Sequence, residues 1–524
     1  MSFFCITSNE RKSNSYFDGY AFADRSLVMN YGGYEKYKKE KGSLFDNIED
    51  GRFLLFEKNG DAFRLRADPA GQYIIYYYKQ DDFWAISDSL LKISEVIANS
   101  GLKRKVYQPS VDVFKNERLS LIGGQLVSNN TALKNVKTLG LDEYIELSWV
   151  KVENSFSIKK IPKKKSYTDY EELLCDLVSS WRGRLGAISK MHKESYLALS
   201  GGVDSRAILA LWENSLADKK INCHSHKKYE TEYEIAKKLC VLSSQNFGSG
   251  MKGLSSTALS AEDSYLLSMS ANASIKTNFG FRRNAIKDPQ FHFIGGCAIG
   301  SFYMKSSYKA RAERLIKQFG EAGENVGNEI LLSLKSLGID RKDPWAMFHH
   351  YYNFRARYHY GNEVYTRFGS IQVQPLLDSR LHQIPLLTDK EYVEGNGVVR
   401  DIISVASGNL LNVPFDTPDK VKVKKPKFTE KLSKVEGEEY TCFYGDVDKT
   451  LNFKGAGEAL EANWYGDIKN ILANKKKVMT EVALDLGFDD SYIKQAVNEI
   501  DSFNKGSKLR KSGVLLGVCE IFNS

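Results

Sequence analysis

The chain lacks the features that mark secreted, metal-stapled and membrane proteins. Its 7 cysteines are odd in number, lie far apart and include no Cys-x-x-Cys pair, which argues against a disulfide framework or a zinc site. No stretch reaches the ~18 consecutive apolar residues of a membrane-spanning helix. The start, Met1 to Cys5, has no basic region followed by a long apolar stretch. We therefore expect a soluble, cytoplasmic protein that makes no membrane contact.

Positive charge is not concentrated enough to indicate a nucleic-acid partner. The chain carries 74 Lys and Arg against 65 Asp and Glu, which leaves a formal charge of +9. The excess gathers in two lysine-rich segments, residues 159–165 and 420–427, which a solvated linker and a surface loop explain. Nucleic acid is therefore not expected as the main partner.

The N-terminal third has the pattern of a β-rich domain. A length of 524 residues exceeds the roughly 250–300 residues that one core supports, so two domains are expected. In residues 1–160, short β-like runs alternate with turns. Phe53 to Phe56 and Phe63 to Leu65, for example, flank an Asn59-Gly60 step, which is a strong hairpin signal. We expect residues 1–160 to form a layered β-rich domain.

Beyond the first lysine-rich segment the hydrophobic period changes from two to 3.6 residues, and strands then alternate with helices. This alternation predicts an α/β domain with a parallel sheet over residues 166–524. The expected elements are a helix over 173–188, a strand over 196–199, a helix over 206–212, a strand over 221–225, a helix over 232–240 and a strand over 291–294.

The sequence Ser200-Gly201-Gly202-Val203-Asp204-Ser205 stands where a predicted strand passes into a helix. Glycines let backbone N–H groups approach an anion, and a helix start favours negative charge, so this loop predicts phosphate binding. The hydroxyls of Ser200 and Ser205 can donate to the same oxygens. Asp204 would repel bare phosphate, which indicates a magnesium ion between them. A Walker loop would need a longer glycine spacing and a lysine that is missing here.

The loop resembles the pyrophosphate loop of N-type ATP pyrophosphatases, which cleave ATP to AMP and pyrophosphate. Further segments resemble the asparagine synthetase family. They are Gly51 to Phe56, Arg66 to Gln72, Tyr76 to Tyr78, Trp84 to Ser87, Thr131 to Gly140, Val373 to Asp378 and Asn409 to Pro414. The resemblance implies an Ntn-hydrolase-like, glutaminase-type domain over 1–160. It also implies an ATP-pyrophosphatase (adenine nucleotide alpha-hydrolase-like) domain over 166–524.

The resemblance implies an ATP-dependent enzyme that adenylates a carboxylate for attack by an amine or ammonia, with ATP and Mg²⁺ bound. The acceptor could be a small molecule, a peptide or a sugar acid, and a homo-oligomer is left open. Asp204 would hold the metal, and Arg400, Lys422 and Lys424 would serve catalysis. The expected nucleotide-binding residues are Leu199, Ser200, Gly201, Gly202, Asp204, Ser205, His226, Gly295 and Gly296.

Three departures from the family bear on activity. Ser2 stands where glutamine-using members carry the cysteine nucleophile, so glutaminase activity is not expected, as in the similar β-lactam synthetases and lasso-peptide cyclases. The turn over 294–301 has no acid after Gly295 and Gly296, where the family supplies a second carboxylate. Asn396 lies near the position of a family lysine, and an amide stabilises negative charge less than an ammonium does.

Two alternatives stay open on sequence alone: a nucleotide-binding protein that has lost catalysis, and an RNA-modifying ATP pyrophosphatase. Two features also have more than one interpretation. Arg206 could meet a phosphate or a carboxylate. The aromatic and basic run 349–359 could line a pocket for a sugar or an anion, or form a core helix with an exposed arginine face.

Overall fold

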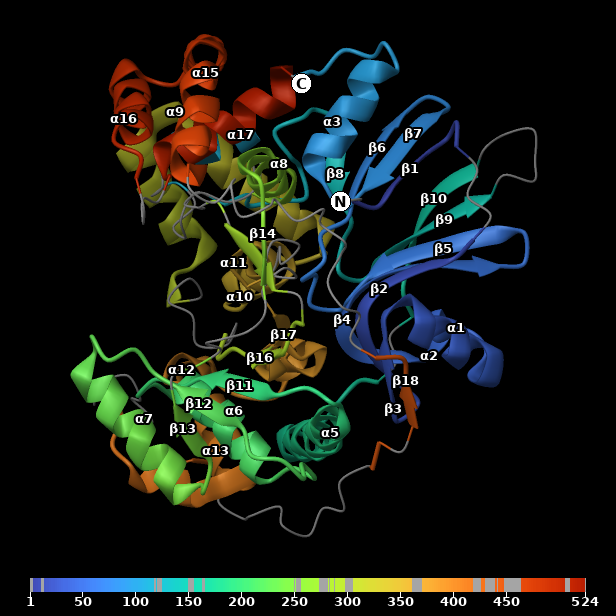
Figure 1. Ribbon diagram of the computed structural model, residues 1–524, viewed down its shortest axis with the longest axis vertical. Coiled ribbons are helices and arrows are strands. Elements are labelled where there is room, and N and C mark those ends of the chain that lie inside the picture. Colours follow the sequence, from blue (N-terminus) through green and yellow to red (C-terminus); the bar gives the residue numbers. More distant parts are fainter. Residues whose placement is uncertain are drawn as a thin grey trace.

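The computed structural model has a mixed α/β architecture (Figure 1), which confirms the expected class. No helix among the described residues has the length and apolar character needed to cross a membrane. The structure describes residues 3–10, 14–116, 119, 125–148, 155–162, 165–248, 250, 256–272, 281, 283–286, 288–296, 305–360, 370–417, 426–428, 439–440, 442–446, 463–504 and 509–523.

Two sheets layer face to face in the N-terminal part. One has the order β1 (Cys5–Thr7), β7 (Phe83–Ser87), β6 (Tyr76–Gln80), β8 (Val136–Thr138). The other has the order β10 (Ser155–Lys160), β9 (Glu143–Ser148), β5 (Ala62–Ala67), β4 (Ile48–Asn59), β2 (Tyr16–Ala23), β3 (Ser26–Met29), β18 (Cys442–Tyr444). A buried cluster joins them, because Ile6 and Trp84 of the first sheet share it with Leu54 and Leu65 of the second. The expected hairpin forms as β4 and β5, which pair from Leu54 with Ala67 to Asn59 with Ala62.

Helices flank these two sheets. They are α1 (Asn30–Lys41), α2 (Leu44–Asn47), α3 (Leu90–Asn99) and α4 (Gln108–Lys115). The described cysteines Cys5, Cys175, Cys223, Cys240 and Cys519 carry free thiols.

A parallel sheet forms the lower half of the molecule in Figure 1, with the order β13 (Asn246–Gly248), β12 (Asn222–His224), β11 (Ser195–Ala198), β16 (Phe291–Phe293), β17 (Ile371–Val373). All four neighbouring pairs are parallel, as the sequence predicts. The elements around it are α5 (Tyr170–Lys190), α6 (Val203–Glu213), α7 (Glu230–Leu242), α12 (Lys390–Glu394), α13 (Gly397–Ser407) and the 3₁₀ segments η4 (Pro375–Leu377), η5 (Ser379–Leu386) and η6 (Gly408–Asn412).

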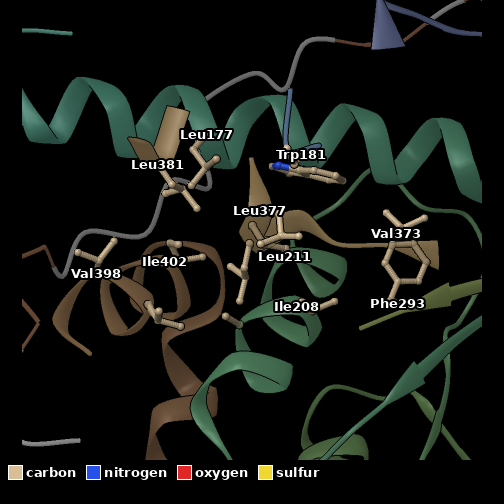
Figure 2. Close-up of a cluster of buried hydrophobic side chains, with 14 of the residues drawn as sticks. Leu177, Trp181, Ile208, Leu211, Phe293, Val373, Leu377, Leu381, Val398 and Ile402 are labelled. Carbon is tan, nitrogen blue, oxygen red and sulfur yellow. The ribbon is translucent and has the colours of Figure 1, made fainter. Parts of the chain in front are cut away.

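One face of this sheet is packed with helices. Figure 2 shows Trp181 of α5, Ile208 of α6, Phe293 of β16 and Ile402 of α13 meeting in a single cluster. The burial follows from the alternation of side chains along each strand. Leu197 of β11, Cys223 of β12 and Phe293 of β16 point to this face, whereas their immediate neighbours in each strand point to the other face. The sheet and its helices thus give β11 and α6 a rigid setting.

The C-terminal helices return to the N-terminal part of the chain. In Figure 1 they lie beside α3 and α8 (Ala261–Asn272). Arg104 donates to the Ile521 carbonyl at 3.3 Å, and the Tyr492 hydroxyl donates to the Phe114 carbonyl at 3.2 Å. Residues 463–523 therefore share a core with residues 74–133. The remaining elements are β14 (Ser256–Ala258), β15 (Asn284–Ile286), α8 (Ala261–Asn272), α9 (Tyr308–Ser336), α10 (Ala346–His350), the π-helix η2 (Tyr351–Arg355), α11 (Ala356–Tyr360), α15 (Trp464–Asp485), α16 (Asp490–Asp501) and α17 (Lys511–Asn523).

The aromatic and basic run 349–359 does not present an exposed arginine face. Arg355 and Arg357 are 0% and 2% exposed. Arg355 donates to the carbonyls of Gln125 and Leu126 at 2.5 and 2.8 Å, and Arg357 donates to the Leu139 carbonyl at 2.8 Å. The expectation of exposed arginines was wrong because these side chains satisfy buried backbone carbonyls of the N-terminal part, where water cannot reach.

A second buried contact joins the two parts of the chain. Arg184 of α5, whose side chain is 3% exposed, donates to Asp50 of β4 at 2.8 Å and to Asp378 at 3.0 Å. Arg380 pairs with Asp378 at 2.7 Å. Burial, followed by repulsion from Asp378, raises the pKa of Asp50 to about 7.

Candidate functional site

Residues 199–205 leave the central strand β11, make a compact turn and enter helix α6 at Val203. The hydroxyls of Ser200 and Ser205 lie 3.1 Å apart, and the Ser200 amide also donates to the Ser205 hydroxyl at 3.1 Å. The Gly202 amide donates to the Ser200 hydroxyl at 3.2 Å. At the root of the turn, the Leu199 amide donates to the His224 carbonyl at 2.8 Å. The two serines therefore fix the turn with their own hydroxyls, and because one hydroxyl donates to the other, at most one hydroxyl hydrogen of the pair is left for a further acceptor.

Helix α6 begins immediately after this turn, with Gly202 at its N-cap in an extended conformation. Gly202 has no side chain and so gives α6 no side-chain cap at this position. The first N–H groups of a helix have no partner within it, and the helix dipole adds partial positive charge at the same end. The start of α6 therefore offers donors and a favourable field to an anion.

Gly295, one of the expected nucleotide-binding residues, packs directly on the start of α6. A Cβ atom at Gly295 would lie 2.7 Å from the Ser205 nitrogen and 2.9 Å from its Cα. Because these are backbone atoms, they cannot rotate away, so position 295 has to be glycine for β16 and α6 to approach this closely. Gly296 follows on the same turn, and residues 297–301 lie outside the described part of the chain.

The predicted nucleotide residues gather at one edge of the sheet because the strands are parallel. Leu199, His226 and Gly295 follow β11, β12 and β16, so all lie beyond carboxyl ends, where α/β proteins bind ligands. His226 is exposed, and its Nδ1 accepts from the Lys228 amide at 3.1 Å. It stands at the rim rather than inside the turn.

Two further histidines flank β11 on the face opposite α6. The rings of His224 and His292 lie 5.7 Å apart, centroid to centroid, at 29°. Burial lowers the pKa of His224, and burial together with His224 lowers that of His292 to about 4. Both rings are therefore neutral near pH 7, so they add polarity without charge on this face of the sheet.

Asp204 lies in the first turn of α6 and is partly buried. Mg²⁺ is usually held by one or two protein carboxylates, with water and phosphate oxygens completing its octahedron. Among the described residues, no group of three or more His, Cys, Asp or Glu side chains is arranged to hold a metal ion. The donor set at the turn fits a magnesium ion that arrives with a nucleotide, and it does not resemble a dedicated metal cage.

Arg206 directs its guanidinium to backbone carbonyls. Its guanidinium, fully buried, donates to the carbonyls of Val413 at 2.5 Å and Pro414 at 2.8 Å and lies 4.0 Å from the Phe415 ring centroid. Burial lowers the pKa of Arg206 to about 10, and the charge of Asp416 opposes that shift. Arg206 thus holds residues 413–416 against the turn. Nothing in the sequence indicated this structural role.

Arg400 lies on α13, the helix that packs against α6. The next residue, Asp401, is buried and accepts from the Tyr392 hydroxyl at 2.7 Å and from the Lys427 amide at 2.9 Å. Asp401 thereby anchors the chain where it leaves the second lysine-rich segment. Lys422 and Lys424, the other predicted catalytic residues, lie outside the described residues.

Asn396 caps α13 with φ of 62° and ψ of 25°. Asparagine adopts this left-handed conformation more readily than most residues with a Cβ atom, lysine included. The local backbone therefore accounts for asparagine at this position independently of any catalytic role.

The N-terminal thiol nearest the chain start does not have the character of a nucleophile. Cys5 belongs to β1, and burial, with smaller contributions from Glu10 and Asp88, raises the pKa of its thiol to about 11. A thiol with such a pKa is almost entirely protonated at neutral pH and reacts slowly. Ser2 lies outside the described residues.

Comparison with known proteins identifies no relative: neither protein-family models nor curated protein sequences match this chain.

Proposed function

We propose that the protein is an ATP-dependent, AMP-forming amide synthetase of the asparagine synthetase type. The observation that carries the proposal is the turn 199–205 at the carboxyl end of the central parallel strand. There the Ser200 and Ser205 hydroxyls meet the uncapped start of α6. This arrangement directs hydrogen-bond donors and positive electrostatic potential toward one site that can bind an anion. The sequence of the turn, with its acid at Asp204, favours pyrophosphate over a lone phosphate.

The turn would act by binding the leaving group. Backbone N–H groups at the start of α6 would donate to the β and γ phosphate oxygens, together with the one hydroxyl hydrogen of the Ser200–Ser205 pair that is not held between the two serines. Negative charge grows on these oxygens as the bond to the α phosphate breaks. Asp204 would hold Mg²⁺, which supplies charge neutralisation of the phosphates when it is bound. Gly295 contributes by letting β16 approach, which keeps the start of α6 in place.

In the proposed reaction a substrate carboxylate oxygen attacks the α-phosphorus of ATP and pyrophosphate departs. An amine nitrogen then attacks the acyl carbon, loses its proton, and AMP leaves as the amide forms. Arg400, Lys422 and Lys424 are the proposed cationic groups that stabilise the developing negative charge. The substrate would be a small molecule, a peptide or a sugar acid, and the N-terminal β-rich part would serve as a structural domain without glutaminase activity.

Labelled ATP, magnesium and fractionated extract of the source cells test this proposal. Extract-dependent AMP and pyrophosphate are expected from the wild-type protein, and Asp204→Ala should reduce their rate at least tenfold. Asp61→Asn is a matched control, because Asp61 lies exposed in the β4–β5 turn. Full activity of Asp204→Ala would rule out the metal-binding role. ATP that binds but stays intact in every fraction would instead indicate a nucleotide-binding protein without catalysis.

A further inference from the structure

We propose that Asp416, which lies against Gly201 of the turn, is the second carboxylate of the magnesium–nucleotide site beside Asp204. This inference rests on the proposed function and assigns a residue that the sequence pattern did not single out. The pattern left the site one acid short, because no acid follows Gly295 and Gly296 in the turn after β16, where related enzymes have one.

Asp416 touches the phosphate turn directly. Its amide donates to the Gly201 carbonyl at 3.1 Å. A Cβ atom at Gly201 would lie 2.6 Å from the Asp416 Cβ and 3.3 Å from its Cα. The Asp416 side chain therefore starts in the space that any larger residue at position 201 would need, which explains the first glycine of the turn by contact rather than by backbone conformation.

The position of Asp416 is fixed by an independent set of bonds. Arg206, on the first turns of α6, donates to the carbonyls of Leu410, Val413 and Pro414 and stacks on the Phe415 ring. Buried guanidinium groups that satisfy several carbonyls hold a segment rigidly, because each broken bond would leave a buried polar group without a partner. The helix that presents Asp204 therefore also positions Asp416.

Electrostatics favours the binding of one cation by the two acids. Asp204 belongs to the helix start, and the backbone and Cβ of Asp416 contact the glycine two residues before that helix begins, so both acidic residues stand at one turn. Two negative groups beside a phosphate site repel the phosphate unless a cation lies between them. Mg²⁺ fits, since it takes one or two carboxylates and fills the rest of its shell with phosphate oxygens and water.

Calorimetric titration of ATP, with Mg²⁺ and with a chelator, tests the assignment without any turnover. We expect Mg²⁺ to strengthen ATP binding by the wild-type protein, and Asp416→Asn to lose about tenfold or more of that gain while its metal-free ATP binding stays within about twofold. Asp416→Glu keeps a carboxylate and should retain part of the gain, and Asp61→Asn should behave as wild type. Circular dichroism on each variant confirms that it is folded.

The outcomes separate the inference from the function beneath it. If the wild-type protein binds no ATP with or without Mg²⁺, the proposed function fails. If the wild-type protein shows the Mg²⁺ gain and Asp416→Asn keeps all of it, Asp416 is no metal ligand and the proposed function stands. If Asp416→Asn weakens metal-free binding as much as Mg²⁺-dependent binding, Asp416 only supports the turn, and the assignment is overturned.

Discussion

Replacing Gly295 by alanine tests whether the approach of β16 to the start of α6 forms the nucleotide site. The added Cβ would lie 2.7 Å from the Ser205 nitrogen, 2.9 Å from the Ser205 Cα and 3.1 Å from the Asp204 carbonyl carbon. All three are backbone atoms, so relief requires α6 or β16 to move by several tenths of an ångström. Overpacking of this kind costs ~1–3 kcal/mol. If this whole free-energy cost weakens ATP binding, the ATP affinity drops about 5- to 150-fold.

Two measurements show whether the free-energy cost lowers the global stability or the ATP affinity. Urea unfolding gives the loss of global stability, and calorimetric ATP titration gives the loss at the site. Gly248→Ala is the matched control, because Gly248 lies in β13 of the same sheet and a Cβ there would meet nothing within 4 Å. We expect Gly295→Ala to weaken ATP binding and Gly248→Ala to leave it unchanged. Unaltered stability and unaltered ATP affinity in Gly295→Ala would refute the close-approach argument.

Three further predictions concern the rest of the fold. Arg184→Met should lower the free energy of unfolding by ~3–5 kcal/mol, because it leaves the buried Asp50 without its cation while Asp378 keeps Arg380; urea unfolding checks this, and a loss under 1 kcal/mol would contradict it. The raised pKa of Asp50, about 7 against an ordinary 3.8, means that the folded state holds a proton that the unfolded chain releases. The contribution of Asp50 to the free energy of unfolding is therefore complete below pH 3.8 and is lost as pH rises through about 7. Asp50→Asn should remove this pH dependence from the free energy of unfolding, and an unchanged pH dependence would disprove the assignment. Cys5, with its thiol pKa raised to about 11, should resist iodoacetamide at pH 7, and Cys5→Ala should retain AMP formation, whereas loss of activity would point to a nucleophilic role.

Three strands of the parallel sheet, β11, β12 and β16, were predictable because their signals are local, whereas β13 and β17 were not among the expected strands. Apolar alternation over β11, β12 and β16, and the helical spacing of α5, depend only on neighbours in the sequence. The turn 199–205 could be located for the same reason. The expected strand over 221–225 and helix over 232–240 correspond to Asn222–His224 and Glu230–Leu242, so the type of each element was correct and its ends differed by a residue or two.

The contacts that complete the site were not predictable because they join distant segments. Nothing in the spacing of Asp416 indicates that it lies against Gly201, and Arg206 offers no sequence sign that its partners are the carbonyls of residues 410–414. The return of residues 463–523 to the N-terminal sheet is equally long-range. The arginines at 355 and 357 were expected at the surface because isolated arginines usually are, and only tertiary packing brings the buried carbonyls that hold them.

Exchange of labelled pyrophosphate into ATP tests the central claim most directly, because it requires both cleavage between the α and β phosphates and reversible binding of pyrophosphate at the turn. The account predicts Mg²⁺-dependent exchange when the carboxylate-containing fraction of the extract is added and no amine is present, with loss of exchange in Asp204→Ala. A protein that binds ATP yet shows no exchange with any fraction, or that releases ADP and phosphate instead, would contradict the assignment as an adenylating synthetase.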